Sequence, residues 1–112
     1  MGLFDKFAPG GANPDEISYE DLDAALKSDA CALIDVRETY EFDAGHAPAA
    51  VNLPLSAFDP GQLPADKPVV LICRAGSRSL TALTHAREAG FASARHYRGG
   101  MIGWANSGGE VV

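Results

Sequence analysis

One cysteine, Cys73, stands where a buried strand is expected to end and a helix to begin. It follows the apolar run Val69–Ile72 and opens a short loop containing Gly76, which lets the backbone turn with a positive φ. Such a turn points successive amide N–H groups inward and adds the partial positive charge of a helix N-terminus. Arg74 and Arg78 add fixed positive charges. Each of these features favours the thiolate, so Cys73 is predicted to be a nucleophile that is substantially ionised at neutral pH.

The length of this loop bears on the reaction. A cysteine at a strand–loop–helix turn with arginine serves either phosphoryl transfer or sulfur transfer. Cysteine phosphatases use C-x5-R, a loop that encircles a phosphate, whereas here four residues separate Cys73 from Arg78, and Ser79 occupies the arginine position. The loop is one residue short for a phosphate but suits a persulfide, which is one extra sulfur on the cysteine. Sulfur transfer is favoured, and phosphatase or arsenate reductase activity is the disfavoured alternative.

A second pair of charged residues ends the neighbouring predicted strand. Asp35 and Arg37 are candidates for the rim of the same pocket, because ligands of parallel sheets bind beyond the carboxyl ends of the strands. A structural role is the favoured interpretation. In that role Asp35 accepts hydrogen bonds from the loop, and Arg37 pairs with Glu38 or Glu41.

The remaining cysteine and the histidines are expected to be structural. His46, His85 and His96 have no ligand spacing among them, so no metal site is predicted. Cys31 precedes its strand whereas Cys73 follows its own, which places the two at opposite edges of a parallel sheet. A disulfide needs Cα atoms within about 7 Å, so none is expected, and Cys31 is predicted to be a small buried apolar residue.

Strands and helices alternate along the chain. Apolar runs predict strands at 32–36, 50–53, 69–72 and 94–97, and apolar spacing predicts helices from Ser18, at 38–43, 79–89 and 101–105. Leu80 is assigned to the buried half of the 79–89 helix. The alternation indicates a parallel sheet covered on both faces. Residues 1–14, rich in Gly, Pro and Ala, are predicted to form a flexible arm before a domain at 15–112.

Composition limits the classes of partner. The chain has 112 residues, 46% of them hydrophobic, and a net charge of −6, which argues against general affinity for nucleic acid. Residues 73–112 nevertheless carry five arginines against two glutamates, as a confined anion site would require. No apolar run approaches the roughly 20 residues of a membrane span, and no secretory signal is recognisable. The expectation is a cytoplasmic protein that does not bind membranes.

Four segments, in order, resemble the rhodanese family, specifically its single-domain sulfurtransferases. They are Leu33–Glu38 with Glu41-Phe42, Gly45–Leu55, Cys73–Ser79 and Tyr97–Trp104, and with Ile17 and the first helix they span residues 16–112. The segments depart from the family mildly, with Ala47 where Ile is usual and Ala49 where Gly is usual. These two positions concern packing and leave the reactive loop untouched.

The resemblance implies a fold, a reaction and its residues. The fold would be one α/β domain with a five-stranded, mostly parallel sheet and helices on both faces. Cys73 would take a sulfane sulfur from an anionic donor, such as thiosulfate or a low-molecular-weight persulfide, and pass it to cyanide or a thiol without a cofactor. One of the two loop arginines could instead brace the loop. The implied substrate-binding residues are Arg74, Ala75, Gly76, Ser77 and Arg78.

A different functional class stays open beside this one. The same domain could dock a protein partner, or relay sulfur to a protein acceptor, without turning over small molecules. Turnover of thiosulfate and cyanide that depends on Cys73 separates the two.

Overall fold

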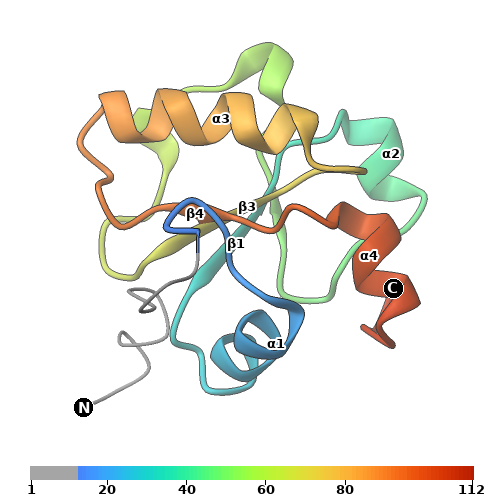
Figure 1. Cartoon of the computed structure of the whole chain (residues 1–112). Helices are drawn as coiled ribbons and strands as arrows, with labels where there is room; N and C mark the ends of the chain where they lie inside the picture. The colour runs from blue at the N-terminus through green and yellow to red at the C-terminus, as the bar shows by residue number, and fades with distance from the viewer. Residues whose placement is uncertain (1–12) are drawn as a thin grey trace.

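A parallel sheet lies at the centre of the structure, a computed structural model that describes residues 13–112. In the sheet order β2-β1-β3-β4 all neighbours are parallel, and β1 pairs with β3 from Ala32 opposite Val69 to Asp35 opposite Ile72 (Figure 1). Of the two central strands, β3 is a continuous apolar run and β1 is apolar up to Asp35, as strands buried on both faces should be. The strand bounds are β1 Ala32–Asp35, β2 Val51–Asn52, β3 Val69–Ile72 and β4 Arg95–His96.

The described residues contain four strands, so the prediction of five is wrong. What remains of a fifth strand is one isolated parallel bridge between Glu16 and His96. The chain leaves the sheet at once because Ser18 caps a helix, its hydroxyl accepting the Asp21 amide at 3.1 Å. Most of the predicted arm, residues 1–12, lies outside the described residues.

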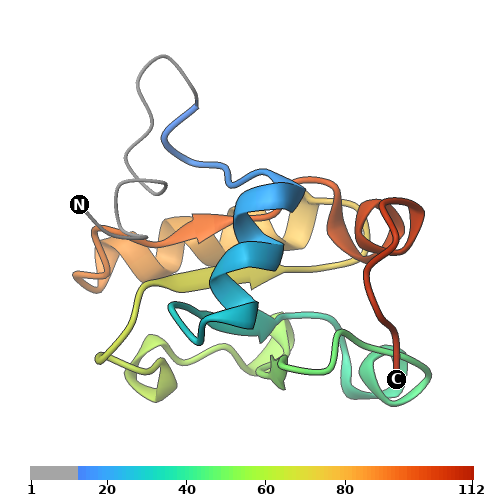
Figure 2. The same cartoon turned by 90° about the horizontal axis from the view of Figure 1, so that it is seen from below.

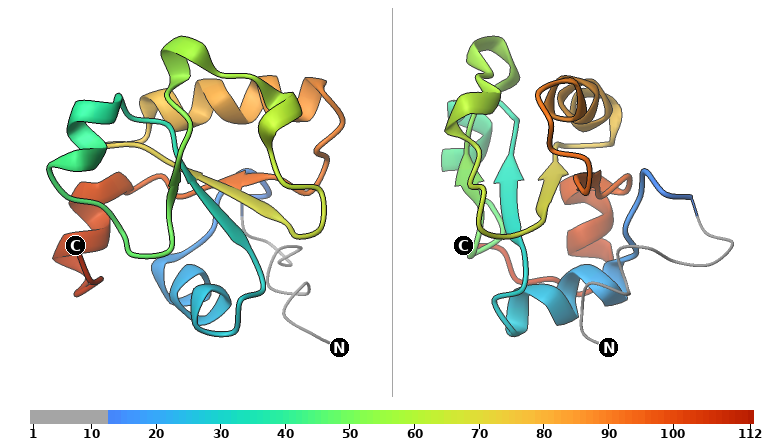
Figure 3. Two further views of the ribbon diagram at one scale, coloured as in Figure 1. Left: turned by 180° about the vertical axis from the view of Figure 1, so that it is seen from behind. Right: turned by 90° about the vertical axis from the view of Figure 1, so that its left-hand side faces the viewer.

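Helices cover both faces of the sheet, as predicted. Figures 1 and 2 place α3 on one side of the strands and α1 on the other, and both views in Figure 3 agree. Side chains of β3 alternate accordingly, with Val70 and Ile72 packing in the cluster of α1 and α4, and Val69 and Leu71 in that of α3. The helix bounds are α1 Tyr19–Lys27, α2 Thr39–Asp43, α3 Ser77–Glu88 and α4 Gly100–Asn106.

The start and the buried face of α3 differ from the prediction. The helix begins at Ser77 rather than at residue 79, and Leu80 is 48% exposed instead of buried. The buried stripe runs through Ser79, Ala82, Leu83 and Ala86 at the usual helical spacing. A polar residue thus occupies the first position of the apolar face, directly behind Cys73.

The long connection after β2 is more ordered than a plain loop. It contains two short 3-10 turns, η2 (Leu55–Ala57) and η3 (Pro60–Gln62). Leu63, directly after η3, is buried in the same cluster as the apolar residues of α3. Among the described helices, none has the length and apolar character needed to cross a bilayer.

Candidate active site

The segment from Cys73 to Arg78, called here the Cys73 loop, connects the end of β3 to the first turn of α3. Gly76 precedes the helix with a φ of +105°, and a Cβ there would lie 2.5 Å from the carbonyl oxygen of Arg98. Only glycine satisfies both the conformation and the space. The positive φ predicted for Gly76 is confirmed, and it turns the chain abruptly into α3.

The start of α4 shapes the loop from outside. Its amides at Met101 and Ile102 donate to the carbonyl oxygens of Cys73 and Arg74, at 2.8 and 3.2 Å. Gly100, with a φ of +63°, lies so close that a Cβ would be 2.2 Å from the Arg74 oxygen. Because these two carbonyl oxygens are turned toward α4, the loop is free to direct amides, not carbonyls, toward the sulfur.

The sulfur of Cys73 lies at the bottom of this loop, with 1% of the residue exposed. The Gly76 amide donates to Sγ at 3.1 Å, and the Ser79 hydroxyl lies 3.4 Å from Sγ. Burial by itself raises the pKa of the thiol. Hydrogen bonds from the Ser79 hydroxyl and from the amides of Ser79, Gly76 and Ala75 outweigh burial, so the pKa of Cys73 lies below its usual value.

The two arginines of the loop differ in their contacts. Arg78 forms a bidentate pair with Glu41 of α2, with Nη1–Oε1 at 2.5 Å and Nη2–Oε2 at 3.0 Å. This pair raises the pKa of Arg78 and ties the start of α3 to α2. Arg74 is exposed, so the loop presents Arg74 to solvent and engages Arg78 in bracing.

Asp35 and Arg37 form a buried ion pair beside the loop. The guanidinium contacts the carboxylate at 2.7 Å and also donates to the Gly45 carbonyl at 2.8 Å. The expected partnership of Arg37 with Glu38 or Glu41 is therefore wrong, because the nearer carboxylate, two residues back, binds it. Asp35 does accept the loop amide of Arg37, at 3.0 Å, as expected.

A shallow groove adjoins the Cys73 loop. Its charged side chains are Arg37, Glu41 and Arg74, and its exposed apolar side chains are Tyr40, Ile102 and Val111. Asp35 has none of its surface exposed, so it can serve this rim only through Arg37. The groove joins α2, the Cys73 loop and α4, three elements that meet at the carboxyl edge of the sheet.

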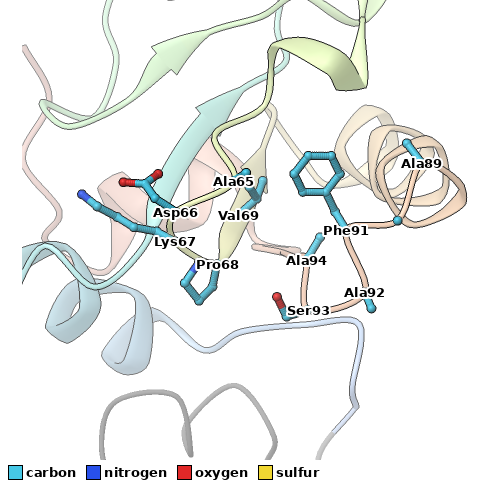
Figure 4. Close-up of a pocket in the computed structure, with 11 residues that line it drawn as sticks. Ala65, Asp66, Lys67, Pro68, Val69, Ala89, Phe91, Ala92, Ser93 and Ala94 are labelled. Carbon is cyan, nitrogen blue, oxygen red and sulfur yellow. The ribbon is translucent and has the colours of Figure 1, made fainter.

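Another pocket, shown in Figure 4, lies at the opposite edge. Asp66, Lys67 and Pro68 before β3, and Ala89 and Phe91 after α3, contribute to its lining. It contains no cysteine, histidine or arginine. It therefore lacks the groups that the predicted chemistry needs.

Cys31 also belongs to that opposite edge. It precedes Ala32, which pairs with Val69 at the beginning of β3, whereas Cys73 follows its end. Cys31 is buried, both cysteines are free thiols, and burial raises the pKa of Cys31 to about 11. The prediction that Cys31 is buried is confirmed. Among residues 13–112 no group of three or more His, Cys, Asp or Glu side chains could hold a metal ion.

Sequence reasoning missed the contacts that surround the loop. The sequence marks Ser79 only as the position a phosphatase would give to arginine, and His96 only as a histidine with no ligand spacing to the other two. The pair Gly99-Gly100 was a visible signal, since adjacent glycines often mark a close approach of two backbones. The Ser79 and His96 contacts had no such signal, because the two residues are 17 positions apart.

The site and the sheet together define a class, an α/β domain with a cysteine that accepts backbone hydrogen bonds at a strand–helix turn. The family model "Rhodanese-like domain" matches residues 18–107, and the chain belongs to this family. A sulfurtransferase of Allochromatium vinosum is 33% identical over 100 residues, which cover 87% of this chain and 94% of that protein.

One solved structure and one further sequence relative agree with this family. The structure of the human single-domain sulfurtransferase TSTD1 matches with a TM-score of 0.74 and 28% identity, covering 84% of this chain and 97% of that one. The probable adenylyltransferase/sulfurtransferase MoeZ of Mycobacterium tuberculosis is 42% identical over 78 residues, 66% of this chain. The matched segments are 20% of the length of MoeZ and 52% of another curated relative, so this chain is similar to one part of those proteins.

Proposed function

We propose that this protein is a sulfurtransferase that carries a sulfane sulfur as a persulfide on Cys73. The observation that carries the proposal is the Cys73 sulfur at the bottom of a six-residue loop, with a hydrogen bond from the Gly76 amide at 3.1 Å. Sulfur transfer as the general reaction is supported by two relatives named sulfurtransferases, both of them matched over nearly their whole length.

The reaction would proceed in two displacements. The Cys73 thiolate attacks the outer sulfur of thiosulfate, the sulfur–sulfur bond of the donor breaks, and sulfite leaves with the bonding electron pair. The acceptor, cyanide or a thiolate, then attacks the outer sulfur of the persulfide, and Cys73 leaves as a thiolate. No oxidant or external proton is required, and covalent catalysis of this kind gives double-displacement kinetics.

The loop residues would divide the work of binding. The amides of the Cys73 loop stabilise the anionic outer sulfur, as fixed dipoles do in an oxyanion hole. Ala75 and Ser77 lie on the exposed side of the loop with Arg74, whose charge attracts an anionic donor such as thiosulfate or a small persulfide. Arg78 holds the loop in shape through Glu41. The low exposure of the sulfur favours a donor that presents a single projecting atom.

Relay to a protein acceptor is a second candidate. The groove beside the loop exposes Tyr40 and Ile102, at 76% and 43%, next to Arg74. Large apolar side chains beside a charge suit a macromolecular partner better than a small anion. The match to a part of the probable adenylyltransferase/sulfurtransferase MoeZ supports the same alternative.

Steady-state turnover of thiosulfate and cyanide tests the proposal. We expect parallel lines in double-reciprocal plots, loss of turnover in Cys73→Ala, and unchanged turnover in the matched control Cys31→Ala. Negligible turnover of the wild type that Cys73→Ala leaves unaltered contradicts the proposed enzyme and favours the docking role. Hydrolysis of a phosphate ester that depends on Cys73 would instead revive the phosphatase alternative.

A further inference from the structure

The reaction proposed above assigns no role to His96, which forms a buried polar pair with Ser79 behind the Cys73 loop. Ser79 has no exposed surface, and His96 of β4 is 3% exposed. The Ser79 Oγ lies 2.9 Å from the His96 Nδ1, 3.2 Å from the Gly76 carbonyl oxygen and 3.4 Å from the Cys73 Sγ. A line of three side chains therefore leads from β4 to the reactive sulfur.

The Ser79 hydroxyl has one proton to give, but it has three neighbours. If the His96 ring accepts that proton at Nδ1, neither the Gly76 carbonyl nor the sulfur can receive it. If Nδ1 carries a proton and donates to the Ser79 Oγ, the hydroxyl proton is free for the other two. The Cys73 thiolate, being charged, is then the stronger acceptor.

We propose that His96 is a positioning residue for Cys73: its Nδ1–H donates to the Ser79 Oγ and so directs the Ser79 hydroxyl proton to the Cys73 thiolate. This proposal concerns the Cys73 thiolate before it meets a donor. It rests on the proposed function, because a stabilised thiolate matters only if Cys73 is the nucleophile. No heavy-atom bond forms or breaks, and no proton leaves the three side chains.

The backbone of β4 holds the ring in place for this role. The His96 amide donates to the Asp15 carbonyl at 2.9 Å, and the His96 carbonyl accepts the Ile17 amide at 3.2 Å. These bonds come from the segment that pairs with β4 at the Glu16 bridge. His96 is thus hydrogen-bonded through its backbone on one side and through its ring to α3 on the other.

Burial and the neighbouring arginines favour the neutral form of the His96 ring. Burial lowers the pKa of His96, and Arg87 of α3 and Arg98 after β4 act in the same direction. Asp15 and Glu16, from the segment before α1, act in the opposite direction and do not reverse the result. A neutral imidazole carries a single ring proton, so the position of that proton decides whether Nδ1 donates or accepts.

Two polar substitutions of His96 distinguish the donation of a hydrogen bond to the Ser79 Oγ from a role of His96 in packing alone. In His96→Asn the side-chain amide nitrogen stands where Nδ1 stood, one bond beyond Cγ. In His96→Gln the amide is one bond further along, near the place of Nε2. Both variants are made in a Cys31→Ala background, so that thiolate absorbance in the ultraviolet reports Cys73 alone.

The two variants should titrate differently. In His96→Gln the Ser79 Oγ loses the donor that orients it, so its hydroxyl can turn from the Cys73 sulfur to the Gly76 carbonyl oxygen, 3.2 Å away. Since that turn removes a hydrogen bond to the charged sulfur, we expect His96→Gln to raise the pKa of Cys73 by about one unit, roughly a tenfold loss of thiolate below that pKa. We expect His96→Asn to stay near the background value. The proposal is overturned if the pKa of Cys73 in His96→Gln equals that of the Cys31→Ala background. It is also overturned if that pKa rises equally in both variants.

A double-mutant cycle and one wild-type measurement complete the test. Ser79→Ala should raise the pKa of Cys73, and adding His96→Gln to it should cause no further rise. If the pKa of Cys73 in the double variant rises by about one further unit, His96 does not act through Ser79. In the wild type, nitrogen chemical shifts of the His96 ring should show the proton on Nδ1 once Cys73 is ionised. A proton on Nε2 alone contradicts the proposal even if a variant fails to fold.

These readouts use the free protein without donor. They can fail while Cys73 still forms a persulfide, and persulfide formation can fail while they succeed. The proposed function and the proposed role of His96 are therefore tested separately.

Discussion

Replacing Gly100 by alanine tests whether α4 shapes the reactive loop. The new Cβ would lie 2.2 Å from the Arg74 carbonyl oxygen and 2.4 Å from the Arg74 carbonyl carbon. An ordinary contact begins near 3.4 Å, so the two backbones must separate by about 1.2 Å. That separation breaks the hydrogen bonds from Met101 and Ile102 to the loop carbonyls, each of which contributes about 1 kcal/mol. With about 1–2 kcal/mol for the left-handed conformation, the free energy of unfolding should fall by about 3–4 kcal/mol.

Gly90 offers a matched control. It also has a positive φ, +101°, but a Cβ there meets nothing within 4 Å. Backbone conformation alone predicts that Gly90→Ala is the worse change, since +63° at Gly100 is closer to the ordinary left-handed region. We expect the reverse order in urea unfolding, with Gly90→Ala losing about 1–2 kcal/mol. The pKa of Cys73 should also rise in Gly100→Ala only. A Gly100→Ala variant as stable as Gly90→Ala refutes this account of the loop.

Three further predictions concern charges and the second thiol. Asp35→Asn leaves the Arg37 guanidinium buried without its carboxylate, so the free energy of unfolding should fall by about 3–5 kcal/mol. A loss below about 1 kcal/mol, which is typical of exposed pairs, would show that the pair does not behave as a buried one. The hydrogen bond from Arg78 lowers the pKa of Glu41 to about 2. The ionised carboxylate therefore stabilises the fold fully above pH ~4.3, the ordinary pKa of Glu in the unfolded chain, and this contribution disappears as the pH falls toward 2. Acid unfolding monitored by circular dichroism should show that loss in the wild type and not in Glu41→Gln, and identical curves contradict it. Burial raises the pKa of Cys31 to about 11, so iodoacetamide at neutral pH should modify the loop cysteine first; equal rates at both thiols are incompatible with the structure.

Local signals in the chain were enough to predict the reactive loop and the layers around it. The run Val69–Ile72, the glycine at 76 and the helix that follows are adjacent in sequence, so their arrangement follows from local conformational preferences. The buried state of Cys31 followed in the same way, from its position before a strand. Features of this kind depend on residues adjacent in sequence, so the order of apolar residues, glycines and helix formers is enough to predict them.

Features that depend on distant segments were not predictable. The partner of Arg37 was misassigned because several carboxylates lie near it in sequence, and only the folded structure selects Asp35. The fifth strand was expected from the family, but Ser18 starts a helix so early that one bridge remains. The approach of His96 to Ser79 depends on the pairing of β4 with β3 and has no counterpart in local pattern.

Intact-mass spectrometry after treatment with thiosulfate shows whether Cys73 carries a sulfur atom, on which the proposed function depends. We expect a gain of about 32 Da in the wild type and in Cys31→Ala, no gain in Cys73→Ser, and reversal of the gain by cyanide. A wild-type mass that thiosulfate and a small persulfide donor both leave unchanged, or an equal gain in Cys73→Ser, would contradict the proposed function.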